Sequence, residues 1–270
     1  MEWDVLASGF GLPEAPTPDP AGALYFSDVL GGGVRRLDPS GELTIVVPKR
    51  RGVGGLALHA DGGLVCSGRE LVHVQATGES RAVLHVDGVA GWNDLGTDAA
   101  GRVYAGALRF AVFDRDAKAV PGEVWCVGPG ADPTVAFDGV VHANGIAVAP
   151  DRLTVYCSDT RRRCVVTFDI ANARRAEIDI APYGEPDGLA LDEQGALWVA
   201  LLRGGIGRFR PDGTLDRRIE PPCEFVTSVA FAGRELYVTA GPHRDAPASG
   251  GCVLRTTVDV GGLPVAPARV

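Results

Sequence analysis

Six similar segments of this sequence each begin with a small or polar residue, and these residues have the types and the spacing to do chemistry. We refer to them as the head residues: Glu14, Gly54, Asn93, Asn144, Asp187 and Ser228. Asn and Asp are common before strands, so turn chemistry can explain any one of them alone. Two carboxylates and two amides in equivalent positions indicate instead that the segments share one polar site.

The chemistry that suits this set is the binding of a divalent metal ion. Two carboxylates brought together without a counter-charge repel each other, and a divalent cation is their natural partner. All-oxygen ligands favour hard ions such as Ca²⁺, Mg²⁺ and Mn²⁺ over a thiolate-type zinc site. Four protein ligands leave coordination positions for water or substrate, as catalytic metal sites do. We expect one ion, Ca²⁺ first, with Mg²⁺, Mn²⁺ or Zn²⁺ as alternatives.

Repeats position the head residues. The heads are separated by 40, 39, 51, 43 and 41 residues. Each is followed by a short apolar run, a turn that usually contains Gly, and a second run such as Leu-Tyr-Val, which predicts a hairpin. Each repeat also has a second half that reads as another hairpin, as in 33–47 and 205–215. Four strands make a blade, so residues 1–270 are predicted to form one all-β domain, a six-bladed β-propeller with four antiparallel strands per blade.

The two ends of the chain are predicted to close the ring together. The sixth repeat lacks one strand, because the chain ends soon after Gly251–Val258. Trp3–Ser8 is a spare strand, and by completing the last blade it would also protect an exposed sheet edge. The long third step contains an insertion, Leu108–Pro121, that we expect to form a loop over one face. The innermost strands of a propeller start on the same face, so the heads should converge near the axis.

Composition limits the partners of the protein. The net charge is −8, which argues against nucleic acid or an anionic membrane as a partner. No stretch approaches the ~20 apolar residues of a membrane helix, and the N-terminus does not read as a signal peptide. The six cysteines form no C-x-x-C pair and mostly lie in apolar runs, so we expect buried, reduced thiols. We expect a cytoplasmic monomer or weak homodimer that handles a small-molecule substrate.

Four motifs occur in order along the chain and resemble those of a known family: Leu12–Pro16, Trp92–Arg102, Ala143–Ile146 and Pro186–Leu189. They are similar to motifs of the gluconolactonase, senescence-marker-protein (regucalcin) and luciferin-regenerating-enzyme family, and the resemblance runs through nearly the whole chain. The resemblance implies a six-bladed propeller with one divalent ion held by Glu14, Asn144 and Asp187. It places Asn93 close to the ion and the substrate, and it implies hydrolysis of a lactone.

The resemblance also suggests how the reaction would run. The ion would act as a Lewis acid on the lactone carbonyl and stabilise the oxyanion of the tetrahedral intermediate. Asp187 is the expected general base for the attacking water. The ion also needs the charge of this carboxylate, so the two roles of Asp187 are not separable. Asn93 is expected to donate its amide N–H to a substrate oxygen.

Segments that follow the second strand of each repeat should surround the site, because that strand returns to the face where the first strand began. They carry these basic residues: Arg69, Arg109, Arg161, Arg203, His243 and Arg244. Each can be a solvated loop charge; Arg109 is the preferred substrate contact, with its neighbour Phe110 on the inserted loop. His142 is a further candidate, with a structural role as the alternative. Asp94 should be turned away from the ion by strand alternation.

One position departs from the family pattern. Sugar-lactone members often carry an Arg two residues before the equivalent of Asn93, and this chain has Gly91 there, followed by Trp92. Trp92 is therefore a further expected substrate contact. The exchange of a charged donor for a large apolar ring suggests a less polar lactone than an aldonolactone.

Other functions are compatible with the same residues. A phosphotriesterase-like hydrolase would use the ion to polarise a P=O group, and a non-catalytic Ca²⁺-binding regulatory protein would use it for binding alone. Strictosidine-synthase-like condensing propellers usually lack the full set of metal-binding heads. Open coordination positions and the arginines around the site favour an enzyme.

Overall fold

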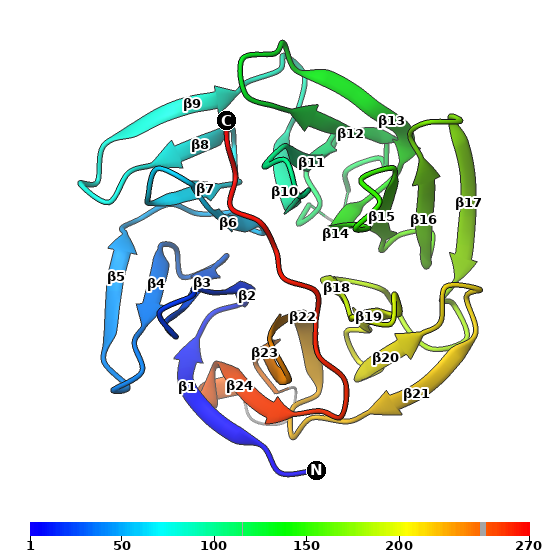
Figure 1. Cartoon of the computed structure of the whole chain (residues 1–270). Helices are drawn as coiled ribbons and strands as arrows, with labels where there is room; N and C mark the ends of the chain where they lie inside the picture. The colour runs from blue at the N-terminus through cyan, green and yellow to red at the C-terminus, as the bar shows by residue number, and fades with distance from the viewer. Residues whose placement is uncertain (115, 244–246) are drawn as a thin grey trace.

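Six four-stranded antiparallel sheets surround a central axis, as Figure 1 shows, and the predicted six-bladed β-propeller is confirmed. The computed structural model describes residues 1–114, 116–243 and 247–270. In the first five blades the strands follow the chain from the axis outwards, so each head segment supplies or leads into the innermost strand. The repeat of the sequence is therefore also the structural repeat.

The first three blades each take their four strands in chain order, from the axis outwards. Blade one consists of β2 (Pro13–Pro18), β3 (Leu24–Asp28), β4 (Val34–Leu37) and β5 (Leu43–Val47). Blade two consists of β6 (Leu56–Leu58), β7 (Leu64–Cys66), β8 (Leu71–Val74) and β9 (Ser80–Leu84). Blade three consists of β10 (Gly91–Thr97), β11 (Val103–Leu108), β12 (Gly122–Val127) and β13 (Thr134–Val140).

The last three blades follow the same order, except that the outermost strand of blade six comes from the N-terminus. Blade four consists of β14 (Ala143–Val148), β15 (Thr154–Asp159), β16 (Cys164–Asp169) and β17 (Arg174–Asp179). Blade five consists of β18 (Leu189–Leu191), β19 (Leu197–Ala200), β20 (Ile206–Phe209) and β21 (Leu215–Ile219). Blade six consists of β22 (Phe225–Ala232), β23 (Glu235–Gly241), β24 (Gly251–Thr257) and β1 (Asp4–Phe10).

The two ends of the chain close the ring as predicted. Strand β1 pairs antiparallel with β24, in register from Asp4 opposite Arg255 to Phe10 opposite Gly251. An ion pair joins the first of these, with Arg255 Nη2 2.8 Å from Asp4 Oδ2. Because β1 pairs with the edge of β24, the sixth blade has four strands, as the other blades do.

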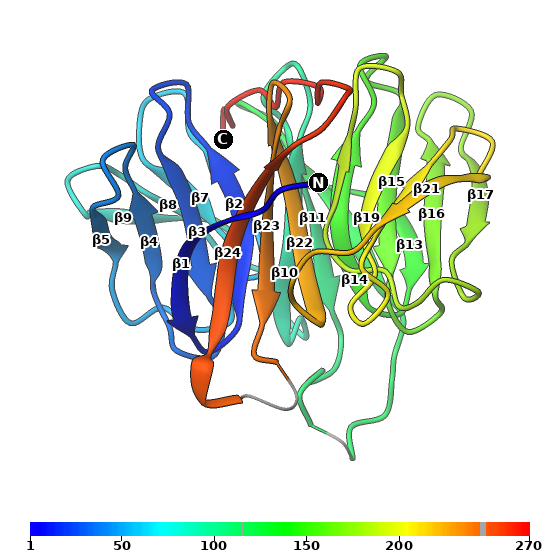
Figure 2. The ribbon, with the colours of Figure 1, turned by 90° about the horizontal axis from the view of Figure 1, so that it is seen from below.

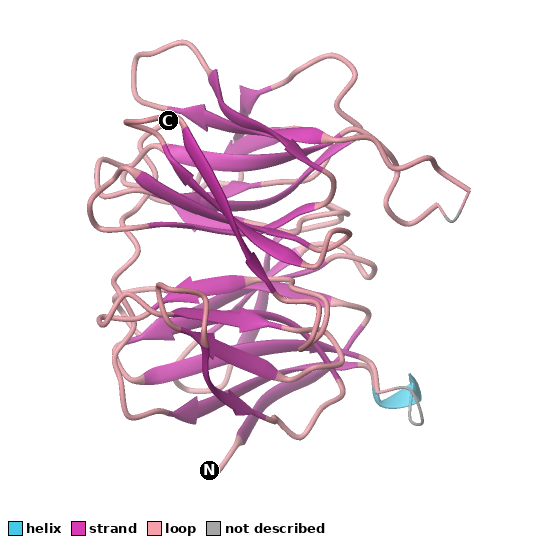
Figure 3. Ribbon diagram, turned by 90° about the vertical axis from the view of Figure 1, so that its right-hand side faces the viewer, coloured by secondary structure: helices cyan, strands magenta, loops and turns pink. Residues whose placement is uncertain are grey.

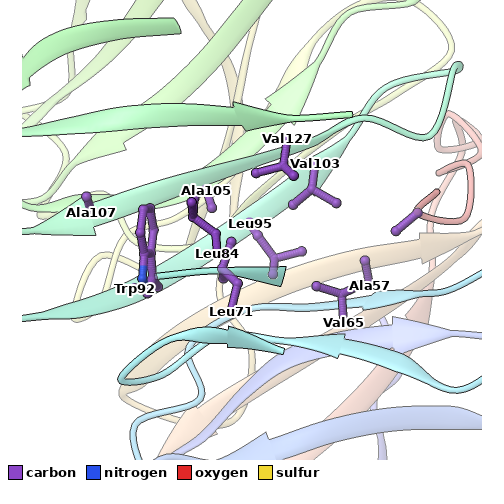
Figure 4. Close-up of a cluster of buried hydrophobic side chains, with 11 residues drawn as sticks. Ala57, Val65, Leu71, Leu84, Trp92, Leu95, Val103, Ala105, Ala107 and Val127 are labelled. Carbon is purple, nitrogen blue, oxygen red and sulfur yellow. The ribbon is translucent and has the colours of Figure 1, made fainter. Parts of the chain in front are cut away.

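Hydrophobic side chains of adjacent blades pack against each other and hold the ring together. One such cluster joins blades two and three, and Figure 4 shows its members, among them Leu71, Trp92 and Leu95. The ring of Trp92 is 1% exposed and meets Trp125 edge-on, with 6.4 Å between the ring centroids. At ~25 cal/mol per Å² of buried apolar surface, such contacts between blades contribute much of the stability of the ring.

The two faces of the propeller differ. The face where the inner strands begin, which we call the head face, carries the loop between β11 and β12 and the short 3₁₀ helix η1 (Pro247–Ser249), as Figures 2 and 3 show. The inserted segment thus forms a loop on one face, as predicted. The C-terminal segment 261–270 crosses the opposite face, which we call the tail face (Figures 1 and 2). The inner strands and residues 263–265 line an apolar cavity of about 180 Å³.

Hydrogen bonds attach the C-terminal segment to several blades. Ala268 pairs with His59 of blade two and donates its N–H to Leu58 at 2.7 Å. Leu263 donates its N–H to Leu191 of blade five at 2.9 Å. The tail therefore bridges the inner strands of blades two and five across the axis.

Two further expectations concern the cysteines and the membrane. All six cysteines are free thiols; three are buried and three are half-buried. Among the described residues, no helix is long and apolar enough to cross a membrane.

Candidate functional site

The head residues of neighbouring blades contact each other around the axis. Asn93 of blade three donates from Nδ2 to the carbonyl oxygen of Ala143 in blade four, at 3.0 Å. The next residue, Asn144, is the head of blade four, and Gly145 donates its N–H to the carbonyl oxygen of Asp187 at 3.1 Å. One side-chain and one backbone hydrogen bond thus fix the heads of blades three, four and five relative to one another.

The same kind of contact continues through blades six and one. Gly188 donates its N–H to Thr227, the residue before the head Ser228, at 2.9 Å. The Thr227 hydroxyl donates to the carbonyl oxygen of Pro13, the residue before Glu14, at 2.7 Å. The predicted convergence of the heads at the axis is therefore what the structure shows.

Gly54, the head of blade two, supplies space and no ligand. A Cβ on this glycine would lie 2.3 Å from Asn93 Oδ1, so a larger residue would displace the Asn93 side chain. Ser67 holds the glycine in place, because its Oγ accepts the N–H groups of Gly54 and Gly55 at 3.0 and 2.9 Å. The Asn93 side chain therefore requires a glycine at position 54.

Irregular pairing of the inner strands aims the polar heads. Register shifts interrupt the hairpins at four of them: Glu14–Thr17 in β2, Trp92–Leu95 in β10, Ala143–Ile146 in β14 and Val226–Ser228 in β22. The residue after Glu14, Ala15, has φ +52°, which is uncommon for a residue other than glycine. β-Bulges redirect side chains and are frequent beside active sites. The heads are therefore positioned by local departures from regular strand geometry.

The bulge in β10 corrects the expectation for Asp94. Asn93 and Asp94 both lie inside this bulge, so strand alternation does not turn Asp94 away, and its charge raises the pKa of both Glu14 and Asp187. Burial raises the pKa of Asp94 itself to about 7, although its carboxylate accepts the N–H of Leu95 at 2.7 Å. Sequence reasoning missed this third carboxylate because it assumed regular alternation.

Glu14 and Asp187 form a buried acidic pair. Their exposed fractions are 9% and 5%. Burial is the main cause that raises the pKa of each, and the charge of Asp187 also raises the pKa of Glu14. Hydrogen bonding by Asn144 acts in the opposite direction on the pKa of Asp187. Asp187 Oδ1 is buried and has no hydrogen-bond partner, which is rare for a carboxylate oxygen inside a protein.

Thr160 orients the amide of Asn144, and this residue was not singled out from the sequence. Asn144 Nδ2 donates to Thr160 Oγ1 at 3.2 Å, and the Thr160 hydroxyl donates to the carbonyl oxygen of Pro186 at 2.7 Å. Because Pro186 precedes Asp187, this one hydroxyl ties together the heads of blades four and five. With Nδ2 engaged, the carbonyl oxygen of the amide remains available as a ligand.

Two buried aspartates hold the segments that lead into the heads. Asp28, at the end of β3, accepts the N–H groups of Gly11 and Leu12 at 3.0 and 2.9 Å. Asp159, at the end of β15, accepts those of Val141 and of the residue that follows it at 2.8 and 3.1 Å. The same device therefore fixes the approach to Glu14 and to Asn144.

These contacts fit a hard divalent cation. The described residues contain no group of three or more His, Cys, Asp or Glu side chains placed to hold a metal, so a site here needs amide oxygens as well. Glu14 and Asp187 supply two buried carboxylates, one with an unpartnered oxygen, and Asn93 and Asn144 each have one amide N–H engaged elsewhere. An oxygen donor set of this kind suits Ca²⁺, Mg²⁺ or Mn²⁺.

Two of the predicted substrate contacts, Phe110 and His142, lie together in the structure. Phe110, which is 6% exposed, lies edge-on to His142 with 6.4 Å between the ring centroids. Burial and the charge of Arg161 lower the pKa of His142 to about 4, so the imidazole is neutral near pH 7. The Arg161 guanidinium lies over the Phe110 ring, 5.9 Å from its centroid. These three residues form a cluster beside Asn144.

Arg109 and Trp92 have other partners. The guanidinium of Arg109 makes a two-pronged ion pair with Glu123, with Nε and Nη2 each 3.0 Å from a carboxylate oxygen, and Nη1 donates to the Asp87 carbonyl at 3.2 Å. Trp92 packs in the core between blades (Figure 4). The preference for a less polar lactone relied on this ring, and its burial removes that support.

The remaining basic residues of the head face are spread around its edge. Arg69 and Arg203 are exposed, and the Arg203 guanidinium lies 5.1 Å from the centroid of Phe225. His243 is also exposed, and Arg244 lies outside the described residues.

The chain is similar to known proteins in sequence and in fold. Residues 12–241 match the family model described as SMP-30/Gluconolactonase/LRE-like region. A 6-deoxy-6-sulfogluconolactonase of Pseudomonas putida is 31% identical, with 88% of each chain covered. The pentonolactonase XacC of Haloferax volcanii is 30% identical, covering 84% of this chain and 81% of that protein. The structure of a calcium-binding protein, regucalcin, from Agrobacterium tumefaciens matches with a TM-score of 0.83 at 22% identity, covering 98% of this chain and 96% of that one.

Proposed function

Because this chain belongs to the SMP-30/gluconolactonase/LRE-like family, we propose that it is a hydrolase that opens a lactone at the head face with the help of one divalent cation. The observation that carries this proposal is the buried pair of Glu14 and Asp187, in which Asp187 Oδ1 has no hydrogen-bond partner. Two buried acids with raised pKa values are costly unless a cation or a reacting group uses them. The names of two relatives, a sulfogluconolactonase and a pentonolactonase, support a sugar-type lactone.

Four residues would hold the cation: Glu14, Asn93, Asn144 and Asp187. Ca²⁺ is the first choice, since the donors are all oxygen and a solved relative is described as calcium-binding. When bound, the ion supplies Lewis acidity, which polarises the lactone carbonyl and stabilises negative charge on its oxygen. Thr160 keeps the Asn144 amide oriented for this role through the hydrogen bond at 3.2 Å.

Asp187 is the proposed general base. A water molecule attacks the lactone carbonyl carbon while its proton passes to a carboxylate oxygen of Asp187, for which the unpartnered Oδ1 is available. The bond between the carbonyl carbon and the ring oxygen then breaks. The ring oxygen takes the proton from Asp187, and the product is the hydroxy acid. In the metal-free protein burial raises the pKa of Asp187, and a bound cation would act in the opposite direction, so that the carboxylate would be ionised and able to take the proton.

We propose that Asn93 contacts both the cation and the substrate. Its Nδ2 donates one N–H to Ala143, so one N–H remains for a substrate oxygen while the amide oxygen faces the position that Gly54 leaves open. The neutral imidazole of His142 and the ring of Phe110 would line the proposed substrate site next to Asn144. We propose these three as substrate contacts.

The direct test is a panel of lactones assayed by proton release, with added Ca²⁺, Mg²⁺, Mn²⁺ or Zn²⁺ and with a chelator. We expect acidification that the chelator abolishes and that one of the ions restores. Glu14→Ala should lose most bound metal, measured by elemental analysis of the purified protein. Normal metal content in that variant would contradict the ligand assignment. Hydrolysis of a phosphotriester but of no lactone would contradict the substrate class, and metal binding without any hydrolysis would favour a regulatory protein.

A further inference from the structure

Three consecutive arginines occupy the turn between β15 and β16 on the head face, and carboxylates hold two of them. Arg162 Nη1 lies 2.7 Å from Glu177 Oε1. Arg163 Nη2 lies 3.0 Å from Glu185 Oε1. Both pairs are partly exposed, and they give the two side chains partners in β17 and in the segment before Asp187. Such exposed pairs contribute little to stability, but they account for the direction of both arginines.

The first arginine of the turn, Arg161, is different. It forms no ion pair with any residue that the structure describes, and its guanidinium lies over the ring of Phe110 at 5.9 Å. The nearest carboxylate along the chain is that of Asp159, and its two oxygens accept the backbone N–H groups of Val141 and His142. The Asp159 carboxylate is thus held by the backbone and forms no ion pair with Arg161.

Arg161 is also fixed beside the proposed cation ligands. It directly follows Thr160, whose hydroxyl accepts from the Asn144 amide at 3.2 Å and donates to Pro186 at 2.7 Å. Phe110, over which the guanidinium lies, meets His142 edge-on at 6.4 Å. The turn that carries Arg161 is thus tied to Asn144 through Thr160, and the Arg161 guanidinium lies over Phe110, one of the proposed substrate contacts.

We propose that Arg161 binds an anionic oxygen group of the substrate, carried at a distance from the reacting carbonyl, and so makes the protein selective for acidic lactones; this inference rests on the proposed lactonase function. A guanidinium presents a planar fork of donors that matches a carboxylate, sulfonate or phosphate with two parallel hydrogen bonds. The cation–π contact with the Phe110 ring favours one direction of the exposed Arg161 side chain.

The experiment compares lactones that differ in one charged group. Wild-type protein is assayed with D-gluconolactone, which is neutral, with D-glucarolactone, which carries a free carboxylate, and with gluconolactones that carry a terminal sulfonate or phosphate. We expect kcat/KM to be higher for at least one acidic lactone than for the neutral one. That preference should weaken as salt is raised, because salt screens exposed charges. The carboxylate, sulfonate and phosphate arms identify which anion fits.

Matched variants assign the preference to Arg161. Arg161→Gln should lower kcat/KM for the preferred acidic lactone about 10–100-fold, in line with the loss of a charge-assisted hydrogen bond, and that for D-gluconolactone less than about threefold. Arg162→Gln removes the same charge one residue away and should change neither value by more than about threefold. Arg161→Lys should retain part of the preference, since it keeps the charge and loses the fork.

The outcomes separate this inference from the proposed function. If wild-type protein opens lactones with no preference for the acidic ones, or if Arg161→Gln lowers activity on all of them equally, Arg161 has no role in selectivity and the lactonase proposal stands. An equal effect of Arg162→Gln would likewise refute the assignment, because the loss of one positive charge anywhere in the turn would then explain the result. If no lactone is opened under any metal condition, the proposed function itself fails.

Discussion

Two buried aspartates of blade five stand at opposite ends of one short inner strand, β18, and their surroundings differ. Asp187, on the head face, is 5% exposed, and its Oδ1 has no hydrogen-bond partner. Asp192, on the tail face, is fully buried and accepts from Trp198 Nε1 at 2.9 Å and from Arg208 Nε at 2.8 Å, in addition to two backbone N–H groups. One carboxylate is fully satisfied by the protein, and the other keeps an oxygen without a partner, which the proposed cation or substrate would engage.

The two faces of the propeller differ in how their buried charges are paired. On the tail face, buried charges are paired and the C-terminal segment bridges the inner strands, so that end holds the ring closed. On the head face, Glu14, Asp94 and Asp187 gather with no arginine or lysine paired to them among the described residues. An acidic cluster of this kind lowers the stability of the fold unless a cation binds. Functional sites often destabilise a protein in this way, and the rest of the fold compensates.

The largest effect that would test this comparison is expected from Asp187→Asn. The variant keeps the size of the side chain and removes the base and one ligand charge, so kcat should fall by about 10²–10⁴-fold or more. The free energy of unfolding of the metal-free protein should rise or stay the same, because a buried charge is removed. Turnover assays with metal analysis and urea denaturation measure both quantities. Wild-type turnover with full metal content would remove Asp187 from the mechanism.

The counterpart at the other end of the strand is Asp192→Ala. It leaves the buried Arg208 guanidinium without its main partner, although Asp216 still lies 2.9 Å from Nη1. Breaking a buried ion pair costs about 3–5 kcal/mol, and the remaining contact places the expected loss near 3 kcal/mol. Denaturant unfolding would show this loss, while kcat and metal affinity of the folded variant should stay within about twofold. A variant as stable as wild type would mean that the tail-face pair has no structural role.

The sequence predicts the ring and its closure fully, but it predicts the acidic residues of the head face only in part. The repeat predicts the ring, its four strands per blade and its closure by Trp3–Ser8, because hairpin patterns and a fixed spacing depend on local chemistry. The four polar heads are also identifiable from their register. Asp94 is missed because a β-bulge changes side-chain direction without changing the residue pattern.

Side-chain partners account for the other differences. Arg109 is the preferred substrate contact from the sequence, but its ion pair with Glu123 depends on how β11 and β12 lie side by side. Trp92 has the size and polarity of both a pocket residue and a core residue, and only packing between blades decides between them. Thr160 acts through a hydrogen bond to the next blade, which no local pattern shows.

A pH series on metal-free protein would sharpen the comparison further. Glu14, Asp94 and Asp187 have pKa values raised above those of the unfolded chain, near 4, and that of Asp94 is raised to about 7. Their contribution to stability is therefore present below pH 4 and is lost as the pH rises through the raised values. The slope reaches at most about 1.4 kcal/mol per pH unit for each proton concerned.

Urea denaturation between pH 5 and 7.5 in the presence of chelator measures this slope. Asp187→Asn should flatten it, because one titrating site and its repulsion are gone. Saturating Ca²⁺ should also remove it, since the bound ion keeps the carboxylates ionised. The same steep slope in Asp187→Asn and in wild type would show that the head-face acids do not control stability, and the contrast between the two ends would then fail.

The smallest effects are expected from two threonines, Thr160 on the head face and Thr97 on the tail face. Thr160→Val removes the hydroxyl that orients Asn144, so the dissociation constant for Ca²⁺ should rise about tenfold, the lower end for residues that position metal ligands. Thr97→Val removes the hydroxyl that donates to Ala266 of the C-terminal segment and should cost about 1 kcal/mol of stability with unchanged Ca²⁺ affinity. Calcium titration calorimetry and thermal unfolding of both variants separate the two effects. Equal loss of affinity in both would mean that the ends of the propeller are coupled, because a change at the tail face would then reach the site through the inner strands.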